Sequence, residues 1–266
     1  MFVTDSFVYI HLPKTGGTFV AETLARIHAE RGDRVDTLWF DPANPVALPV
    51  VEAGHALRLM LTTRQQHGTR SDIPEPYADR PVVATMRHPC ERYVSQYVFG
   101  WWHRQPDRFG PVEWVRATYP RYPDLTFDDF VHLANNAALP FPEGGAPEVA
   151  IGLHTQQCVQ HFFRDPDRAF STLLRTASAA TLAREALADV HILRQQHLND
   201  DLADWLTRWD YRRADIEAVR AAQRIWPPEG GRPADEPWEP YYTPDLLAFV
   251  RHRERLLFEW FPDFDR

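Results

Sequence analysis

The stretch FVYIHLPKTGGTFVAETL, residues 7–24, constrains the fold more than any other part of the sequence. A short apolar run over residues 6–11 ends in a loop with one proline and two glycines, and apolar residues then recur at helical spacing through residues 18–31. An apolar run of this length between loop residues is typical of a buried strand. Strand, glycine loop and helix in this order predict an α/β unit that binds phosphate at the helix N-terminus.

The same loop holds Lys14, the one lysine among the 29 Lys and Arg residues of the sequence. An ammonium group is a rotatable point charge and a guanidinium group is a flat fork, so they are not interchangeable at a reactive site. Gly16 and Gly17 allow backbone N–H groups to approach phosphate oxygens, and Thr18 can donate its hydroxyl or cap the helix. Lysine precedes the glycines, in contrast to G-x-x-x-x-G-K-[ST], and G-x-G-x-x-G is absent, so the usual triphosphate and dinucleotide loops are not indicated.

A second motif, RHPCERYVSQY, covers residues 87–97 after a predicted strand at 80–88. Arg87 falls at the carboxyl end of that strand, where parallel sheets bind their ligands. Arg92 and Ser95 are three residues apart on the predicted helix that follows, so they share a face. Arg87 and Ser95 together can bind one phosphate, while Arg92 either contacts the ligand or pairs with a carboxylate.

Together the two motifs resemble the cofactor motifs of sulfotransferases that use PAPS, 3′-phosphoadenosine 5′-phosphosulfate. The first, from Lys14 through Thr15 to Thr18, is similar to the loop that holds the 5′-phosphosulfate. The second, R-x-P-x-x-R-x-x-S-x-Y from Arg87 to Tyr97, is similar to the loop that holds the 3′-phosphate. The resemblance is to a soluble, bacterial-like member of the carbohydrate branch related to heparan sulfate 2-O-sulfotransferase.

In that branch a Gly-His pair lies between the motifs, as Gly54-His55 does here. The resemblance implies PAPS as the cofactor, PAP as the product, no metal, and a carbohydrate or small-molecule hydroxyl as the acceptor. Lys14 would stabilise the oxygen that leaves with the 5′-phosphate, and His55 would accept the proton of the acceptor hydroxyl. Glu52 is the alternative base, and His11 either lines the site or packs at the strand end.

We expect one α/β domain over residues 1–266, with the three-layer P-loop-like fold that the resemblance implies: a central, mainly parallel sheet flanked by helices. Residues 103–150 form a predicted helical insertion near the acceptor site, and the C-terminal part is predicted to be mostly helical. The loop at 226–242 is predicted to contact cofactor or substrate. This loop is acidic and proline-rich, with Arg232 as its one base.

Further elements follow from the same patterns of spacing and capping residues. A capping box of Thr126 and Asp129 predicts the start of a helix, and Thr243 followed by Pro244 predicts the start of another. The predicted strands are 49–56 and 189–193, in addition to those above, and the predicted helices are 126–137 and 243–261.

An aromatic group precedes and enters the predicted insertion. Aromatic faces stack well on sugars or planar acceptors, and they equally form cores. Both roles remain open for this group, whose members are Trp101, Trp102, Trp114, Tyr119 and Tyr122.

The formal net charge of −8 argues against a nucleic-acid-binding face and against docking on anionic lipid. Cys90 and Cys158 have no metal-ligand spacing and are expected to be reduced thiols. No run approaches the ~18 apolar residues of a membrane span. We therefore expect a cytoplasmic protein.

Two other functions remain possible. The first is a nucleotide-dependent kinase with an atypical phosphate loop, which would need Mg²⁺ and a carboxylate to hold it. The second is a protein that binds a 3′,5′-bisphosphorylated nucleotide without chemistry, which would tolerate the loss of His55.

Overall fold

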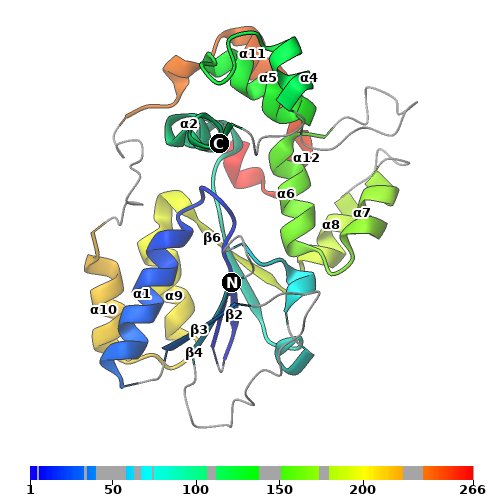
Figure 1. Ribbon diagram of the computed structural model, residues 1–266. Coiled ribbons are helices and arrows are strands. Elements are labelled where there is room, and N and C mark those ends of the chain that lie inside the picture. The colour runs from blue at the N-terminus through cyan, green and yellow to red at the C-terminus, as the bar shows by residue number, and fades with distance from the viewer. Residues whose placement is uncertain are drawn as a thin grey trace. The chain divides into compact units, whose positions relative to one another are not determined.

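A computed structural model (Figure 1) describes residues 1–4, 6–32, 35–39, 58–62, 67–73, 75–106, 112–137, 151–173, 180–223 and 236–265. The chain divides into two compact units, each with a hydrophobic core of its own. The first unit comprises Met1–Arg87, Gln160–Pro166 and Arg184–Trp226, and the second comprises His88–Val159, Asp167–Ala183 and Pro227–Arg266. The expectation of one domain over residues 1–266 stays a prediction.

The first unit is built on one sheet, whose described strands lie in the order β3-β4-β1-β2-β5-β6. β2, β5 and β6 are parallel neighbours, β3 and β4 are parallel neighbours, and β1 is antiparallel to both β2 and β4. Among the described strands, all but the two-residue β1 therefore point the same way. The strands are Phe2–Val3 (β1), Val8–Ile10 (β2), Val35–Trp39 (β3), Arg58–Thr62 (β4), Val82–Met86 (β5) and Val190–Arg194 (β6).

Three helices lie beside one another on one face of this sheet: α1 (Gly17–Glu30), α9 (Leu198–Thr207) and α10 (Arg213–Ala221) (Figure 1). Each of them contributes side chains to the same buried cluster as the strands. Short 3₁₀ turns complete the unit at Arg70–Asp72 (η1), Glu75–Tyr77 (η2) and Gln195–His197 (η5).

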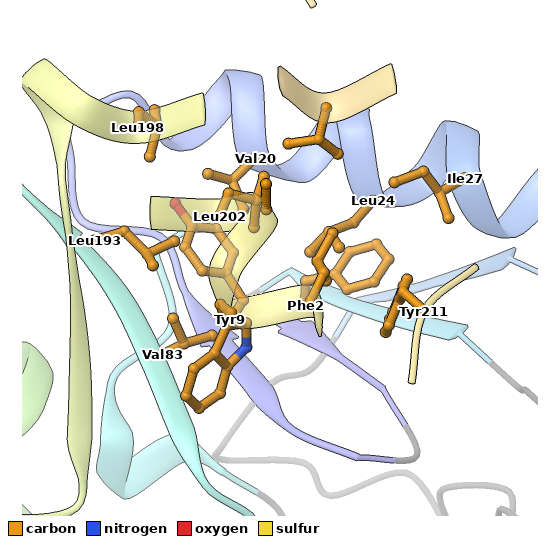
Figure 2. Packing of buried hydrophobic residues seen from close by; sticks show 14 of the residues in the cluster. Phe2, Tyr9, Val20, Leu24, Ile27, Val83, Leu193, Leu198, Leu202 and Tyr211 are labelled. Carbon is orange, nitrogen blue, oxygen red and sulfur yellow. The ribbon is translucent and has the colours of Figure 1, made fainter. Parts of the chain in front are cut away.

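The core between sheet and helices determines where α1 lies. Figure 2 shows Val20 and Leu24 of α1 near Leu202 of α9 and Tyr9 of β2, and all four side chains are fully buried. Burying a side chain such as leucine stabilises a fold by about 1.5–3 kcal/mol. This packing holds α1 against the sheet and so fixes the position of its N-terminus beside the end of β2.

A buried carboxylate links α1 to α10 at the opposite end of α1. Asp215 is 4% exposed and accepts hydrogen bonds from Arg31 at 2.6 Å and from Arg212 at 2.8 Å. Burial alone would raise the pKa of Asp215, but the hydrogen bonds from the two arginines hold it below the ordinary carboxyl value. Asp215 is therefore ionised in the folded protein at neutral pH.

The second unit is helical in the described residues. Helices α6, α7 and α8 have residues in both units. The capping box predicted for α5 is present, because Thr126 and Asp129 exchange hydrogen bonds between side chain and backbone. The helices are Pro89–Phe99 (α2), Trp101–Arg104 (α3), Val112–Thr118 (α4), Phe127–Ala137 (α5), Leu153–Phe162 (α6), Pro166–Leu173 (α7), Ala180–Leu187 (α8), Pro244–Arg253 (α11) and Arg255–Trp260 (α12), with 3₁₀ turns Glu239–Tyr241 (η6) and Pro262–Asp265 (η7).

A buried carboxylate also organises the second unit. Glu254 is 0% exposed and accepts hydrogen bonds from the Tyr93 hydroxyl, the backbone N–H groups of His154 and Thr155, and the Thr155 hydroxyl, at 2.6–2.9 Å. It thereby caps the N-terminus of α6 from a distant part of the chain. A Cβ on Gly152 would lie 2.2 Å from a carboxylate oxygen of Glu254, so only glycine fits there.

The same residue corrects one prediction. The sequence predicts a continuous helix over residues 243–261, and this is wrong: α11 ends at Arg253 and α12 begins at Arg255. Glu254 leaves helical geometry, with φ −98° and ψ 15°, while its side chain caps α6. The start predicted at Thr243 is confirmed, because its side chain accepts a hydrogen bond from the Leu246 N–H.

The predicted α/β class with a central, mainly parallel sheet flanked by helices is confirmed. The strands expected at 6–11, 80–88 and 189–193 are β2, β5 and β6. The strand expected at 49–56 lies outside the described residues.

Candidate functional site

The loop between β2 and α1 leaves the sheet at its carboxyl edge, where β2, β5 and β6 all end. Lys14 in this loop is half-buried and has φ +62°, a left-handed conformation that is uncommon for residues other than glycine. Gly16 follows with φ +96°, and α1 begins at Gly17. The left-handed conformation costs a residue with a Cβ about 1–2 kcal/mol, and strain of this kind is concentrated at functional sites.

The N-terminus of α1 is chemically suited to an anion. Its first turn holds no acidic residue, and within the described part of the chain no side chain caps it. The first N–H groups of a helix have no intrahelical partner and carry a partial positive charge. Thr18 is half-buried in this turn, whereas Thr15 is fully buried and its hydroxyl donates to the Leu12 carbonyl at 2.8 Å.

Packing also requires glycine at both positions of the Gly16-Gly17 pair. A Cβ on Gly17 would lie 1.8 Å from Cδ2 of His11, whose ring fills the space that a side chain would take. A Cβ on Gly16 would lie 2.7 Å from Cδ2 of Leu198 at the start of α9. The expectation that these glycines admit a phosphate stays a prediction.

His67, to which no sequence motif points, contacts the first residue of this loop, His11. Its Nδ1 lies 2.9 Å from the His11 carbonyl oxygen, and the two rings meet edge to face with centroids 4.7 Å apart. A carbonyl oxygen only accepts, so Nδ1–H of His67 is the donor and, in the neutral ring, Nε2 has the lone pair. Burial, and the neighbouring His67, hold the pKa of His11 well below its ordinary value, which makes His11 a weak base.

Arg87 directly follows β5, the parallel neighbour of β2. The register pairs Ile10 with Ala84, so the loop after β2 and the residue after β5 leave the sheet at the same edge. Arg87 is half-buried there. Arg87 therefore lies at the edge of the sheet that the Lys14 loop leaves, and its expected contact with a 3′-phosphate stays a prediction.

Arg92 and Ser95 belong to α2 of the second unit, and both are buried, with 1% and 7% of their surface exposed. Nη2 of Arg92 donates to Oε1 of Gln157 at 2.6 Å. Gln157 is a neutral amide, so this hydrogen bond is not the carboxylate pairing that the sequence left open for Arg92, and that alternative stays a prediction. The roles of Arg92 and Ser95 at a 3′-phosphate stay predictions.

The second unit contains a surface pocket of about 400 Å³, lined in part by Tyr97, Trp102, Arg121 and Thr126. Of the five aromatic residues for which stacking and core roles were both open, Trp102 reaches this pocket, and its indole N–H donates to the Pro123 carbonyl at 3.1 Å. Trp101 and Trp114 are exposed, and Tyr119 and Tyr122 are half-buried and buried respectively. Their contact with an acceptor stays a prediction.

Several predicted site residues lie outside the described part of the chain: Glu52, Gly54, His55 and Arg232. Within the described residues, no group of three or more His, Cys, Asp or Glu side chains is arranged to hold a metal ion. No helix in these parts of the chain has the length and apolar character needed to cross a membrane. Cys90 and Cys158 are free, buried thiols.

No protein-family model and no curated protein matches this sequence. Among solved structures, the chain is similar to mouse sulfotransferase SULT7A1 complexed with PAP, with a TM-score of 0.44 and 12% sequence identity. The match covers 96% of this chain and 84% of that chain. A likeness of this degree says nothing about what this chain binds or catalyses.

Proposed function

We propose that this chain transfers a sulfuryl group from PAPS to a hydroxyl acceptor at the carboxyl edge of the first unit's sheet. One observation carries the proposal: the sole lysine of the sequence is held in a left-handed conformation in the loop before the N-terminus of α1, which no side chain of the described residues caps. A left-handed backbone at a residue other than glycine favours a functional role for that residue.

The residues at this edge fit the anionic groups of PAPS. Lys14 supplies an ammonium, the first turn of α1 supplies backbone N–H groups, and Arg87 supplies a guanidinium from the adjacent strand. The motif assigns Arg87 and Ser95 to the 3′-phosphate, and Arg92 is a further candidate for contact with the cofactor. When bound, PAPS provides an activated sulfuryl group, so the protein needs no metal for activation.

Lys14 would act mainly on the oxygen that leaves with the 5′-phosphate, since negative charge grows there during sulfuryl transfer. An ammonium on a flexible stem can follow that charge as it develops, and such an interaction is stronger in the transition state than in the ground state. The N–H groups of α1 would hold the anion in place beside it.

The acceptor hydroxyl also needs a group that takes its proton. The sequence favours His55, with Glu52 as the alternative. His67 is a third candidate, because its hydrogen bond to the His11 carbonyl fixes the tautomer that has the lone pair on Nε2. The acceptor is proposed to be a carbohydrate or a small molecule, as the sequence resemblance implies.

The test is sulfate transfer from radiolabelled PAPS to a panel of sugars, phenols and small alcohols, with wild type beside Lys14→Ala. The proposal expects transfer by the wild type and a fall of about 10²-fold or more in the variant, with the fold retained. Calorimetry should show tighter binding of PAP than of ADP. Equal affinity for PAP and ADP, or turnover that depends on Mg²⁺ and a nucleoside triphosphate, would favour the kinase instead. Binding of PAP without any transfer would favour the binding protein.

A further inference from the structure

Three buried hydroxyl groups connect the sheet to the loop that holds Lys14. The Tyr9 hydroxyl lies 3.1 Å from Oγ1 of Thr85, and Oγ1 of Thr85 lies 2.6 Å from Oγ1 of Thr15. Thr15 in turn donates to the carbonyl of Leu12 at 2.8 Å. All four residues are 0% exposed, so these hydroxyl groups find their partners inside the protein and not in water.

The chemistry of the last contact sets the direction of the others. A carbonyl oxygen only accepts, so the single hydroxyl proton of Thr15 points to Leu12. Thr15 must then accept from Thr85, and Thr85, having used its own proton, must accept from Tyr9. The series therefore runs one way: from Tyr9 to Thr85 to Thr15 to the Leu12 carbonyl. Burial raises the pKa of Tyr9 well above its ordinary value, which keeps its proton available for donation.

The final hydrogen bond of this series spans the turn that contains Lys14. Leu12 and Thr15 flank the dipeptide Pro13-Lys14, and the bond between them ties the two ends of the turn in which Lys14 is left-handed. Thr85 anchors Thr15 to β5, while Tyr9 belongs to β2, the strand that leads into the loop. The loop is thus fixed to both strands whose ends form the candidate site.

We propose that Thr85 and Tyr9 are positioning residues for Lys14: their hydroxyl groups hold Thr15, and Thr15 holds the turn that places the lysine amine. Neither residue contacts the substrate in this proposal. The chemical role of the amine rests on the proposed function, but the structural link from Thr85 to Lys14 can be tested independently of that function.

The link is tested without any ligand, because the chain has one lysine. Protein grown with ¹³C,¹⁵N-lysine gives one backbone amide and one Cα resonance, both from Lys14. Thr85→Val removes the hydroxyl and keeps the shape, so the Lys14 resonances should shift or broaden, and Thr85→Ser should return them to the wild-type positions. Thr23→Val is the matched control: Thr23 is 1% exposed, and its hydroxyl has no hydrogen-bond partner among the described residues. Unchanged Lys14 resonances in Thr85→Val overturn the proposal.

Kinetics with PAPS then separate positioning from general stability. Thr85→Val should lower kcat about tenfold or more while the affinity for PAP changes less than about threefold, because a misplaced amine binds the anion but misses the reacting oxygen. Thr85→Ser should restore kcat. A lower melting temperature with unchanged kcat, or equal loss in Thr85→Ser and Thr85→Val, overturns the proposal. Should Thr85→Val fail to fold, Tyr9→Phe, which removes the first donor of the series, is judged by the same two measurements.

The two proposals fail in different ways. A wild-type protein that neither binds PAP nor transfers sulfate disproves the proposed function, and the lysine resonances still decide whether Thr85 holds Lys14. A wild-type protein that transfers sulfate, with Lys14 resonances and kcat indifferent to Thr85→Val, disproves the positioning role alone.

Discussion

Replacing Lys14 with glycine is expected to stabilise the fold and to abolish transfer in the same variant. At φ +62° the left-handed backbone of Lys14 destabilises the folded state by about 1–2 kcal/mol, and glycine adopts this conformation freely. Glycine also raises the entropy of the unfolded chain, which lowers the free energy of unfolding by about 0.4–1 kcal/mol. The free energy of unfolding should therefore rise by about 0.5–1 kcal/mol, which raises the melting temperature of a chain this long by about 1–3 °C.

Two variants serve as controls in the same denaturation and transfer assays. Asp210 is exposed between α9 and α10 with φ +53°, so Asp210→Gly should gain stability in the same way and keep wild-type transfer. Lys14→Ala should lose transfer without the gain, since alanine keeps the strain. The functional interpretation is refuted if Lys14→Gly transfers sulfate at the wild-type rate. The strain argument is refuted if Lys14→Gly is less stable than wild type while Asp210→Gly is more stable.

Three further predictions concern other residues described above. Glu254→Gln should lower the free energy of unfolding, measured in urea, by about 3 kcal/mol, because it disrupts the buried acceptor of four hydrogen bonds. The control is Glu259→Gln on the exposed face of α12, which should change the free energy of unfolding by less than about 0.5 kcal/mol. His67→Asn keeps a donor for the backbone carbonyl and removes the basic nitrogen. If His67 takes the proton, turnover falls about 10²-fold or more with PAP affinity unchanged; an unchanged turnover leaves the proton to His55 or Glu52. The pKa of Asp215 is lowered by folding, so its stabilisation is complete above the unfolded pKa of about 3.9 and is lost as the pH falls through the lower folded value. Asp215→Asn should therefore flatten the acid side of the stability–pH curve, and an unaltered acid transition contradicts this.

Local patterns were sufficient to predict much of the fold. The apolar spacing of α1, the proline at the start of α2 and the capping residues Thr126 and Thr243 act over a few residues, and the structure bears them out. β1 was missed because two residues are too few to show a period, and it becomes a strand through pairing with β2 and β4. The break at Glu254 was missed because its cause lies about a hundred residues away, at the N-terminus of α6.

At the candidate site, too, local patterns were predictable from the sequence and contacts between distant residues were not. The order of strand, lysine, glycines and helix is visible in the sequence, and the left-handed backbone of Lys14 is compatible with it. No sequence pattern links His67 to His11, because their contact is a hydrogen bond between residues 56 positions apart. Similarly, the need for glycine at position 17 was assigned to a ligand, whereas the ring of His11 already excludes a side chain there.

The antiparallel strand β1 separates β3 and β4 from β2, β5 and β6 in the sheet. β3 and β4 are joined to each other by five residue pairs, but among the described residues β4 is joined to β1 by the single pair Val3 and Leu59. Two strands joined by few residue pairs separate more easily than strands joined by many, and proteins open locally at such points well before they unfold. Backbone amides of β3 and β4 should therefore exchange with deuterium faster than those of β5 and β6. Local opening of β3 and β4 then leaves the end of β2, where Lys14 lies, undisturbed.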